Sequence, residues 1–186
     1  MADLVRPERP PLTYEDYAAF PDDRNRYEIM EGELYMTPGP GTKHQKLSGR
    51  LFSILSTYIE HLEEGSFYYA PLDVILDNRT VMQPDLLYLS KERASLESER
   101  GIEGPPDLVI EILSPSSMRN DRVFKFRIYA KYRIEWYWML DPDTKVLEEY
   151  ALSGEGYTLV AQINGDEPFR PRLFPGLSLD LSRVWV

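Results

Sequence analysis

Hydrophobic and polar residues recur along this chain with periods that predict three helices. Between residues 42 and 64, apolar side chains return at spacings of three and four, the period of an amphipathic helix. They are Leu47, Leu51, Leu55, Tyr58 and Leu62. Gly65 is expected to end this helix. A short helix is predicted to open at Thr13, because Thr13 and Asp16 match a capping box. The third helix is predicted from about Asn120 to Tyr132.

The remaining apolar runs predict strands. "RYEIMEGELYMTP" reads as a hairpin around the turn Glu31-Gly32. Further strands are predicted at residues 66–76, 81–89, 107–114, 135–140, 145–152 and 156–163. Residues 90–106 are charged and end in Gly-Pro-Pro, so they are expected to form a surface loop, and a Ser-Pro-Ser-Ser turn is expected at 114–117.

This order of elements predicts the fold class. Several strands are long apolar runs, which is typical of a sheet covered on both faces. A chain of 186 residues is long enough for one domain with its own core. We therefore expect an α/β (α+β) domain over residues 12–186, with a central mixed β-sheet flanked by helices and an N-terminal β-hairpin. Residues 1–11 are Pro-rich and charged and are expected to form an irregular arm.

Composition narrows the possible chemistry. The chain has no cysteine and only two histidines, which excludes disulfides, thiolate nucleophiles and Cys- or His-rich metal sites. A metal ion would have to be bound mainly by carboxylates, which favours Mg²⁺ or Mn²⁺. The net charge of -10 is evidence against a protein that coats DNA nonspecifically. No apolar run is long enough for a membrane helix, and no secretory signal is recognisable, so we expect a cytoplasmic protein with no membrane partner.

Two carboxylates interrupt apolar runs. Side chains alternate along a strand, so Glu111 in "DLVIEILSPSS" shares a face with Val109 and Leu113. A buried charge there costs several kcal/mol unless it is paired, hydrogen-bonded or metal-bound. Asp85 stands in "VMQPDLLYL" after Pro84, where a strand irregularity would redirect its side chain. Both residues also have simpler interpretations: Glu111 facing solvent beyond the strand end, and Asp85 as a turn residue.

Single residues near these carboxylates are ambiguous. Lys125 is spaced four residues from Asp121, which is more typical of a salt bridge on a helix surface than of catalysis. Glu28 is expected to point outward from the hairpin, and His44 to lie solvated in the first turn of its helix. The aromatic run Trp136-Tyr137-Trp138 is expected in the core rather than as a platform for bases.

Four blocks in order resemble the Uma2 family, whose members are assigned as endonucleases of the PD-(D/E)XK nuclease superfamily. They are "RYEIMEGELYMTPGPGTKHQKLSGRL", "QPDLLYLS", "GPPDLVIEILSPSS" and "NDRVFKFRIYAKYRIEWYWMLDP". The resemblance covers roughly residues 12–180. It implies a restriction-endonuclease-like fold and a nuclease that uses Mg²⁺ or Mn²⁺ on DNA.

The resemblance also implies which residues would bind the metal. Asp85 matches the acidic residue of the "PD" element, and Glu111 matches that of the (D/E)XK element. Both would be catalytic and would bind the metal ion, with the backbone carbonyl of Ile112 as a further ligand. Glu28 matches the acidic residue of the opening "YE" block and would lie near the metal.

The lysine of the (D/E)XK element is displaced in this sequence. Leu113 stands where that motif has lysine, and the family pattern D-x-x-x-K-x-x-x-Y supplies Lys125 from the next helix instead. Lys125 would position the attacking water or stabilise negative charge. His44 matches a recurring histidine at the start of the first long helix and is a further candidate.

Three functions are weighed. The first is a metal-dependent DNA endonuclease, expected as a homodimer because two active sites related by a twofold axis can cut both strands of a duplex. The second is a catalytically inactive binding or assembly module that retains the nuclease fold; the acidic composition and the missing strand lysine favour it. The third is a carboxylate-pair hydrolase acting on sugars, which would need neither lysine nor metal.

Overall fold

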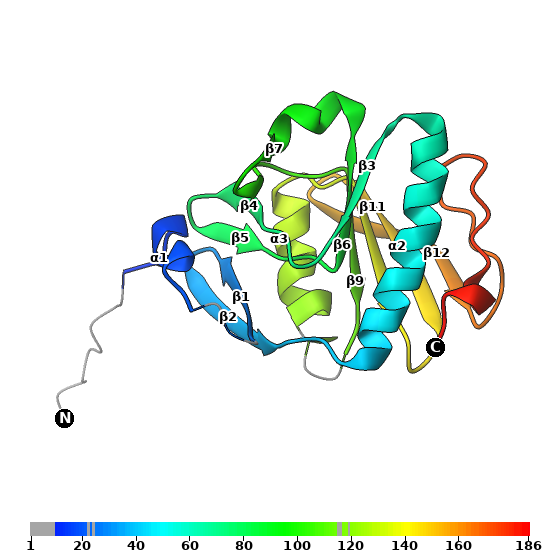
Figure 1. Ribbon diagram of the computed structural model, residues 1–186, viewed down its shortest axis with the longest axis horizontal. Helices are drawn as coiled ribbons and strands as arrows, with labels where there is room; N and C mark the ends of the chain where they lie inside the picture. Colours follow the sequence, from blue (N-terminus) through cyan, green and yellow to red (C-terminus); the bar gives the residue numbers. More distant parts are fainter. Residues whose placement is uncertain (1–9, 22, 24, 115–116, 119) are drawn as a thin grey trace.

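The computed structural model describes residues 10–21, 23, 25–114, 117–118 and 120–186 (Figure 1). Most of the predicted arm at 1–11, and part of the predicted turn at 114–117, lie outside these residues. The helical elements are α1 (Tyr14–Ala18), α2 (Thr42–Leu62), the 3-10 helix η1 (Lys91–Leu96), the π-helical segment η2 (Asn120–Lys125), α3 (Phe126–Lys131) and the 3-10 helix η3 (Leu181–Arg183). In the described part of the chain, no helix has the length and apolarity needed to span a membrane.

The strands form two mixed six-stranded sheets. The first has the order β2 (Glu33–Pro38), β1 (Asn25–Met30), β5 (Thr80–Met82), β4 (Val74–Asp77), β8 (Gly101–Ile102), β7 (Glu97–Ser98). The second has the order β12 (Gly156–Asn164), β11 (Val146–Ser153), β10 (Trp136–Asp141), β9 (Leu108–Ile112), β6 (Leu86–Ser90), β3 (Gly65–Tyr69). The second is the predicted central mixed sheet, since β9 and β10 are parallel and its other pairs antiparallel.

The two faces of β9 are covered by different helices. Leu108, Ile110 and Ile112 belong to a core cluster with the apolar stripe of α2, formed by Leu47, Leu51, Leu55 and Ile59. Val109 and Leu113 belong to a second cluster with residues of α3. Tyr137 and Trp138 are fully buried and Trp136 packs against the first cluster, as expected of core aromatics. The alternation read from the sequence is confirmed, and Glu111 points to the α3 side.

The first elements also form as predicted. The Thr13 N–H donates to Asp16 Oδ2 at 2.8 Å, which is one of the two hydrogen bonds of the capping box. β1 and β2 pair around Glu31 and Gly32, whose φ angles of 54° and 88° suit a tight hairpin turn. The expected end of α2 is wrong by two residues. Glu63 adopts the left-handed conformation instead, with φ 55°.

Two predicted strands are each divided between the two sheets. Residues 66–76 give β3 and β4, and residues 81–89 give β5 and β6. Each break contains a proline, Pro71 or Pro84, which cannot donate to a strand ladder and allows the chain to change sheets. Asp85 therefore directly precedes β6, where the two sheets adjoin.

Two other segments differ from their predictions. Residues 90–106 are not only a loop, because they contain η1 and the short pair β7–β8, in which Gly101 and Ile102 are buried. The third helix begins as the π-helical turn η2 and continues as α3. A π-helical turn is wider than an α-helical one and is frequent at functional sites. Here it carries Asp121 and Lys125, both buried.

Candidate active site

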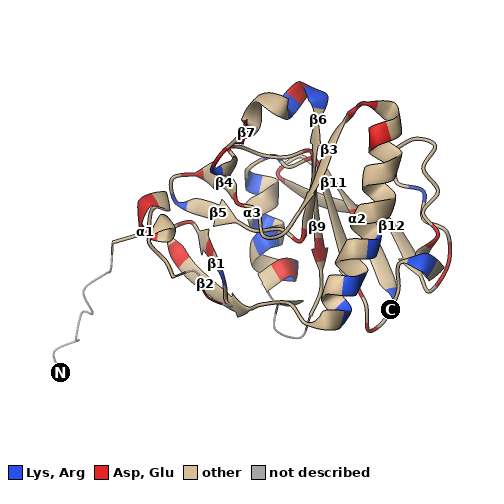
Figure 2. Ribbon diagram, viewed as in Figure 1, with Lys and Arg blue, Asp and Glu red and all other residues tan. Residues whose placement is uncertain are grey.

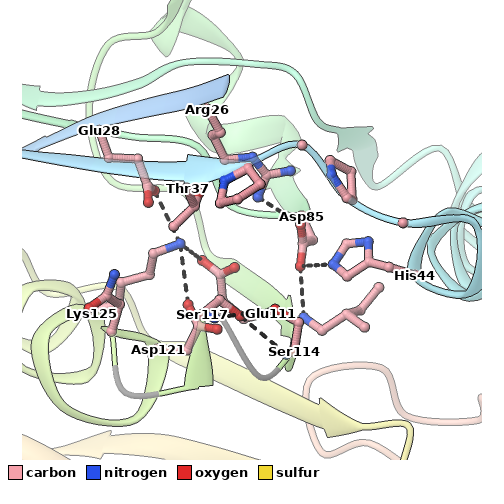
Figure 3. Close-up of a pocket in the computed structure, with 16 residues that line it drawn as sticks. Arg26, Glu28, Thr37, His44, Asp85, Glu111, Ser114, Ser117, Asp121 and Lys125 are labelled. Atoms are coloured by element: carbon pink, nitrogen blue, oxygen red, sulfur yellow. Dashed lines mark hydrogen bonds and ion pairs between the residues drawn. The ribbon is translucent and has the colours of Figure 1, made fainter. Parts of the chain in front are cut away.

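The predicted site residues line one cavity of about 100 Å³ (Figure 3). Its walls come from β1, the end of β2, the loop 39–41, the first turn of α2, the residue before β6, the end of β9 and the segment that leads into α3. Five side chains named from the sequence line it: Glu28, His44, Asp85, Glu111 and Lys125. Segments far apart in the chain thus converge on a single pocket, and the predicted backbone contributor Ile112 lies beside them.

Asp85 is held at both carboxylate oxygens. Its Oδ1 accepts a hydrogen bond from Arg26 Nη1 at 2.9 Å. Its Oδ2 accepts from the Ile112 N–H at 2.8 Å and lies 2.9 Å from His44 Nε2. The Ile112 contact ties Asp85 to the strand that carries Glu111. The expectation of a solvated His44 is wrong, because its ring is turned into the pocket against Asp85.

Glu111 is buried and anchored from the helix side. Its Oε1 accepts from Lys125 Nζ at 3.0 Å and from the Tyr129 hydroxyl at 2.7 Å. The interpretation in which Glu111 ends the strand and faces solvent is therefore wrong, since only 1% of the residue is exposed. Tyr129 is also fully buried, so its hydroxyl fixes the orientation of the carboxylate.

Lys125 is surrounded by three carboxylates (Figure 3). Besides Glu111, its Nζ lies 3.1 Å from Glu28 Oε1 and 3.4 Å from Asp121 Oδ1. Glu28 is buried and faces the pocket, so the expectation of an outward residue is wrong; its Oε1 also accepts from the Gln83 N–H at 2.9 Å. The pair Asp121–Lys125 is not on the helix surface, because both residues are buried and Lys125 contacts Glu28 of β1 and Glu111 of β9.

Several pocket residues were not selected from the sequence. Arg26 could have been, because strand alternation places it on the same face as Glu28. The sequence indicates Asp121 only as a salt-bridge partner of Lys125, yet it is buried and faces the pocket, where its Oδ1 lies 3.4 Å from Lys125 Nζ. Ser114 and Ser117 also line the pocket and hydrogen-bond to each other at 3.0 Å. Their sequence context, a turn after a strand, carries no such signal.

Burial and charge displace the pKa values in this pocket. Burial alone would raise the pKa of Asp85, but the His44 hydrogen bond and the Arg26 charge outweigh it and lower the pKa to about 2. Burial raises the pKa of Glu111 well above its usual range, and the Lys125 charge offsets only part of this. Burial would lower the pKa of Lys125, yet the surrounding carboxylates raise it well above its usual range. Lys125 is therefore the charged partner of the cluster.

The pocket has more carboxylates than cations. Glu28, Asp85, Glu111 and Asp121 stand against Arg26 and Lys125, and four negative charges against two positive ones leave two unbalanced when all are ionised. A divalent cation, or bound protons, would balance them. Oxygen ligands are those that Mg²⁺ and Mn²⁺ prefer. The donor type and the charge of the pocket therefore fit a divalent ion.

The present arrangement is closed around Lys125. In the described part of the chain, no three His, Asp or Glu side chains are placed to chelate a metal ion. The reason is visible in the distances: the ammonium group lies between Glu28, Glu111 and Asp121, and both oxygens of Asp85 are hydrogen-bonded. Asp85 and Glu111 could hold an ion if Lys125 relaxed its contact with Glu111.

Comparison with known protein families gives a match over most of the chain. The model of the Uma2 family, described as "Putative restriction endonuclease", matches residues 14–182. Two uncharacterized proteins of Synechocystis sp. are similar to this chain. One is 27% identical over 156 residues, covering 81% of this chain and 80% of the relative. The other is 22% identical over 140 residues, covering 75% and 79%.

A solved structure shares the fold. The crystal structure of "a putative nuclease belonging to DUF820" from Anabaena variabilis superposes with a TM-score of 0.77 at 19% identity. The match covers 94% of this chain and 98% of the other. The likeness confirms the expected nuclease-like fold over nearly the whole chain.

Proposed function

Because this chain belongs to the Uma2 family, we propose that it is a metal-dependent endonuclease that hydrolyses phosphodiester bonds of DNA. The observation that carries the proposal is the convergence of Asp85, Glu111 and Lys125 in one buried pocket with an excess of negative charge. Two acidic groups and one ammonium group meet the needs of phosphoryl transfer, in which catalysis is mostly positioning and electrostatic stabilisation.

Asp85 and Glu111 would hold the metal ion, with the backbone carbonyl of Ile112 completing the ligand set and Glu28 contributing directly or through water. A bound Mg²⁺ or Mn²⁺ lowers the pKa of a coordinated water and stabilises charge on a phosphoryl oxygen. The remaining contacts keep these ligands in place. His44 and Arg26 hold Asp85 at 2.9 Å each, and the hydroxyl of Tyr129 holds Glu111 at 2.7 Å.

Lys125 would act on the water and on the developing charge. Its ammonium group stays protonated, since the carboxylates around it raise its pKa. It can therefore donate hydrogen bonds that orient the attacking water, and it can stabilise the negative charge that builds on the phosphoryl group. The first turn of α2 would also favour negative charge at the pocket, because backbone N–H groups at the start of a helix attract anions. This turn has no side-chain cap and no acidic residue, and its residue His44 lines the pocket.

A catalytically inactive module with the nuclease fold is the second candidate. One observation favours it: Lys125 already supplies a positive charge at the place where the carboxylates would hold an ion. In that case the buried cluster would be a structural ion-pair network with no ion bound. We further propose that the active protein is cytoplasmic and a homodimer, because two active sites related by a twofold axis are the simplest way to cut both strands of a duplex.

Cleavage of supercoiled plasmid DNA tests the proposal. Wild type, Asp85→Ala and Lys125→Met are each incubated with Mg²⁺, with Mn²⁺ and with EDTA, and the products are resolved as nicked and linear forms. Metal-dependent cleavage by wild type, abolished in both variants, is the expected result. Cleavage that survives in Asp85→Ala contradicts the proposed site, and no cleavage by wild type under any condition favours the inactive module.

A further inference from the structure

The first half of α2 is basic, although the whole chain has a net charge of -10. From Thr42 to Ile59 the helix contains Lys43, Lys46 and Arg50 and no acidic residue; Glu60 is the first. Figure 2 shows these positive positions on the first half of α2, which begins at the pocket, and the negative one near the other end of the helix. Positive charge is thus concentrated beside the candidate active site.

Lys46 and Arg50 are spaced four residues apart and are both exposed, so they lie on one face of the helix. The apolar stripe of Leu47 and Leu51 occupies a different, buried face. Lys43 differs from these two basic residues, because its Nζ is paired with Asp143 Oδ1 at 2.7 Å. The charges of Lys46 and Arg50 are therefore less neutralised within the protein than that of Lys43, and more available to an anionic partner.

Arg183 extends this face from the other end of the chain. The Arg50 Nη1 donates to the Trp185 carbonyl at 2.5 Å, which brings η3 against α2. Gly49, Arg50, Ser53 and Arg183 line a shallow hollow of about 530 Å³ between the two elements. Among the residues that the structure describes, Lys46, Arg50 and Arg183 form no ion pair with a carboxylate. The nearby Asp180 is engaged by the N–H and hydroxyl of Ser182.

We propose that Lys46, Arg50 and Arg183, here called the α2 basic surface, bind the sugar-phosphate backbone of nucleic acid next to the cleavage point. The inference rests on the proposed nuclease function. His44 lines the pocket, and Arg50 follows it by six positions, an axial rise of about 9 Å and a rotation of about 240° around the helix. The α2 basic surface therefore lies on the opposite side of α2 from His44, about 13 Å away across a helix about 10 Å wide. One strand advances roughly 3.4 Å per nucleotide, so the surface would contact phosphates about four nucleotides from the scissile one. Contacts of this kind set the register of the substrate without reading sequence.

The salt dependence of binding tests this surface. The affinity of a fluorescently labelled 25-base-pair DNA duplex is measured by anisotropy between 50 and 300 mM salt, in Ca²⁺ and in EDTA. Each lost phosphate contact lowers the slope of log K against log salt by about 0.9. Lys46→Gln is expected to lower it by about one, and Lys46→Gln/Arg183→Gln by about two. Arg50 is left intact because its contact with Trp185 supports the fold.

Lys91→Gln is the matched control. Lys91 is exposed, begins η1 and lies outside the pocket lining, and its replacement changes the net charge by the same single unit as Lys46→Gln. The slope of the control should equal that of wild type. If wild type binds DNA and all variants keep its slope, the α2 basic surface is overturned while the nuclease proposal stands. If wild type binds in neither Ca²⁺ nor EDTA, both proposals are overturned.

Discussion

The central sheet buries two glutamates, Glu111 on β9 and Glu149 on β11, in different surroundings. Glu149 has no measurable exposure and Glu111 has 1%. Glu149 lies at a β-bulge, where its Oε1 accepts from the Arg172 N–H at 3.1 Å. Glu111 instead accepts from Lys125 and Tyr129 and lines a cavity with three further carboxylates.

The difference shows that burial alone does not mark a functional carboxylate. Burial raises the pKa of Glu149 as it raises that of Glu111. Glu149 is tied to the backbone of a single loop, which is a structural role. Glu111 shares its pocket with residues from β1, α2 and η2 and with Asp85, directly before β6, and this convergence of several elements on one cavity is the stronger sign of chemistry.

The largest effect expected is on activity. Glu111→Gln should reduce metal-dependent DNA cleavage on the order of 10³-fold, because it removes a charge that would hold the metal ion in the transition state. Glu149→Gln should leave cleavage within about twofold of wild type, since Glu149 contacts no pocket residue. Initial rates on the same plasmid substrate make the comparison. Equal losses in the two variants would contradict the distinction between them.

Replacement of Lys125 should have the next largest effect, on stability. Lys125→Met keeps most of the side-chain volume but leaves Glu28, Glu111 and Asp121 without their shared positive charge. Breaking a buried ion pair in this way costs about 3–5 kcal/mol of unfolding free energy. Urea unfolding of the metal-free protein measures it. Mn²⁺ should stabilise the variant more than wild type, because the ion no longer competes with the ammonium group, and an equal or smaller response would contradict that competition.

A smaller effect is expected at Tyr129. Tyr129→Phe removes only the hydroxyl that holds Glu111 at 2.7 Å and preserves the ring contact with Tyr137. Loss of such a supporting contact typically lowers metal affinity or activity by about 10-fold to 100-fold, and we expect the lower end. Tyr157→Phe is the control, because its hydroxyl donates to the Ile134 carbonyl outside the pocket. Equal cleavage rates for the two variants would contradict the proposed supporting role of the Tyr129 hydroxyl.

The smallest effect concerns Glu149 and pH. Its pKa is raised above 4.5 in the folded protein, so its contribution to stability is fully present below about pH 4.5 and is lost as pH rises through the folded value. Gln cannot ionise and resembles the protonated form. The unfolding free energy of Glu149→Gln relative to wild type should therefore increase between pH 4.5 and pH 7 in urea titrations. A difference in unfolding free energy that is independent of pH would contradict the raised pKa of Glu149 in the folded protein.

Much of the site could be predicted from the sequence because strand alternation is a local rule. It placed Glu111 on one face with Val109 and Leu113, and Pro84 marked the irregularity that sets Asp85 before β6. The family resemblance, rather than spacing, indicated Lys125. Local rules could not show that η2 is buried, since an i,i+4 Asp–Lys pair has the same spacing inside and outside a protein. The switch between sheets within residues 66–76 and 81–89 depends on long-range pairing, which local sequence does not determine.

Metal-dependent thermal unfolding tests most directly whether Asp85 and Glu111 bind a divalent ion. Wild type, Asp85→Ala and Glu149→Gln are each melted over a titration of Mn²⁺ or Mg²⁺. A ligand that binds only the native state stabilises it by about 2.7 kcal/mol at 100 times its dissociation constant. We predict that the melting temperature of wild type and Glu149→Gln rises with metal, whereas that of Asp85→Ala does not. No response in wild type, or an equal response in Asp85→Ala, would contradict the proposed metal site.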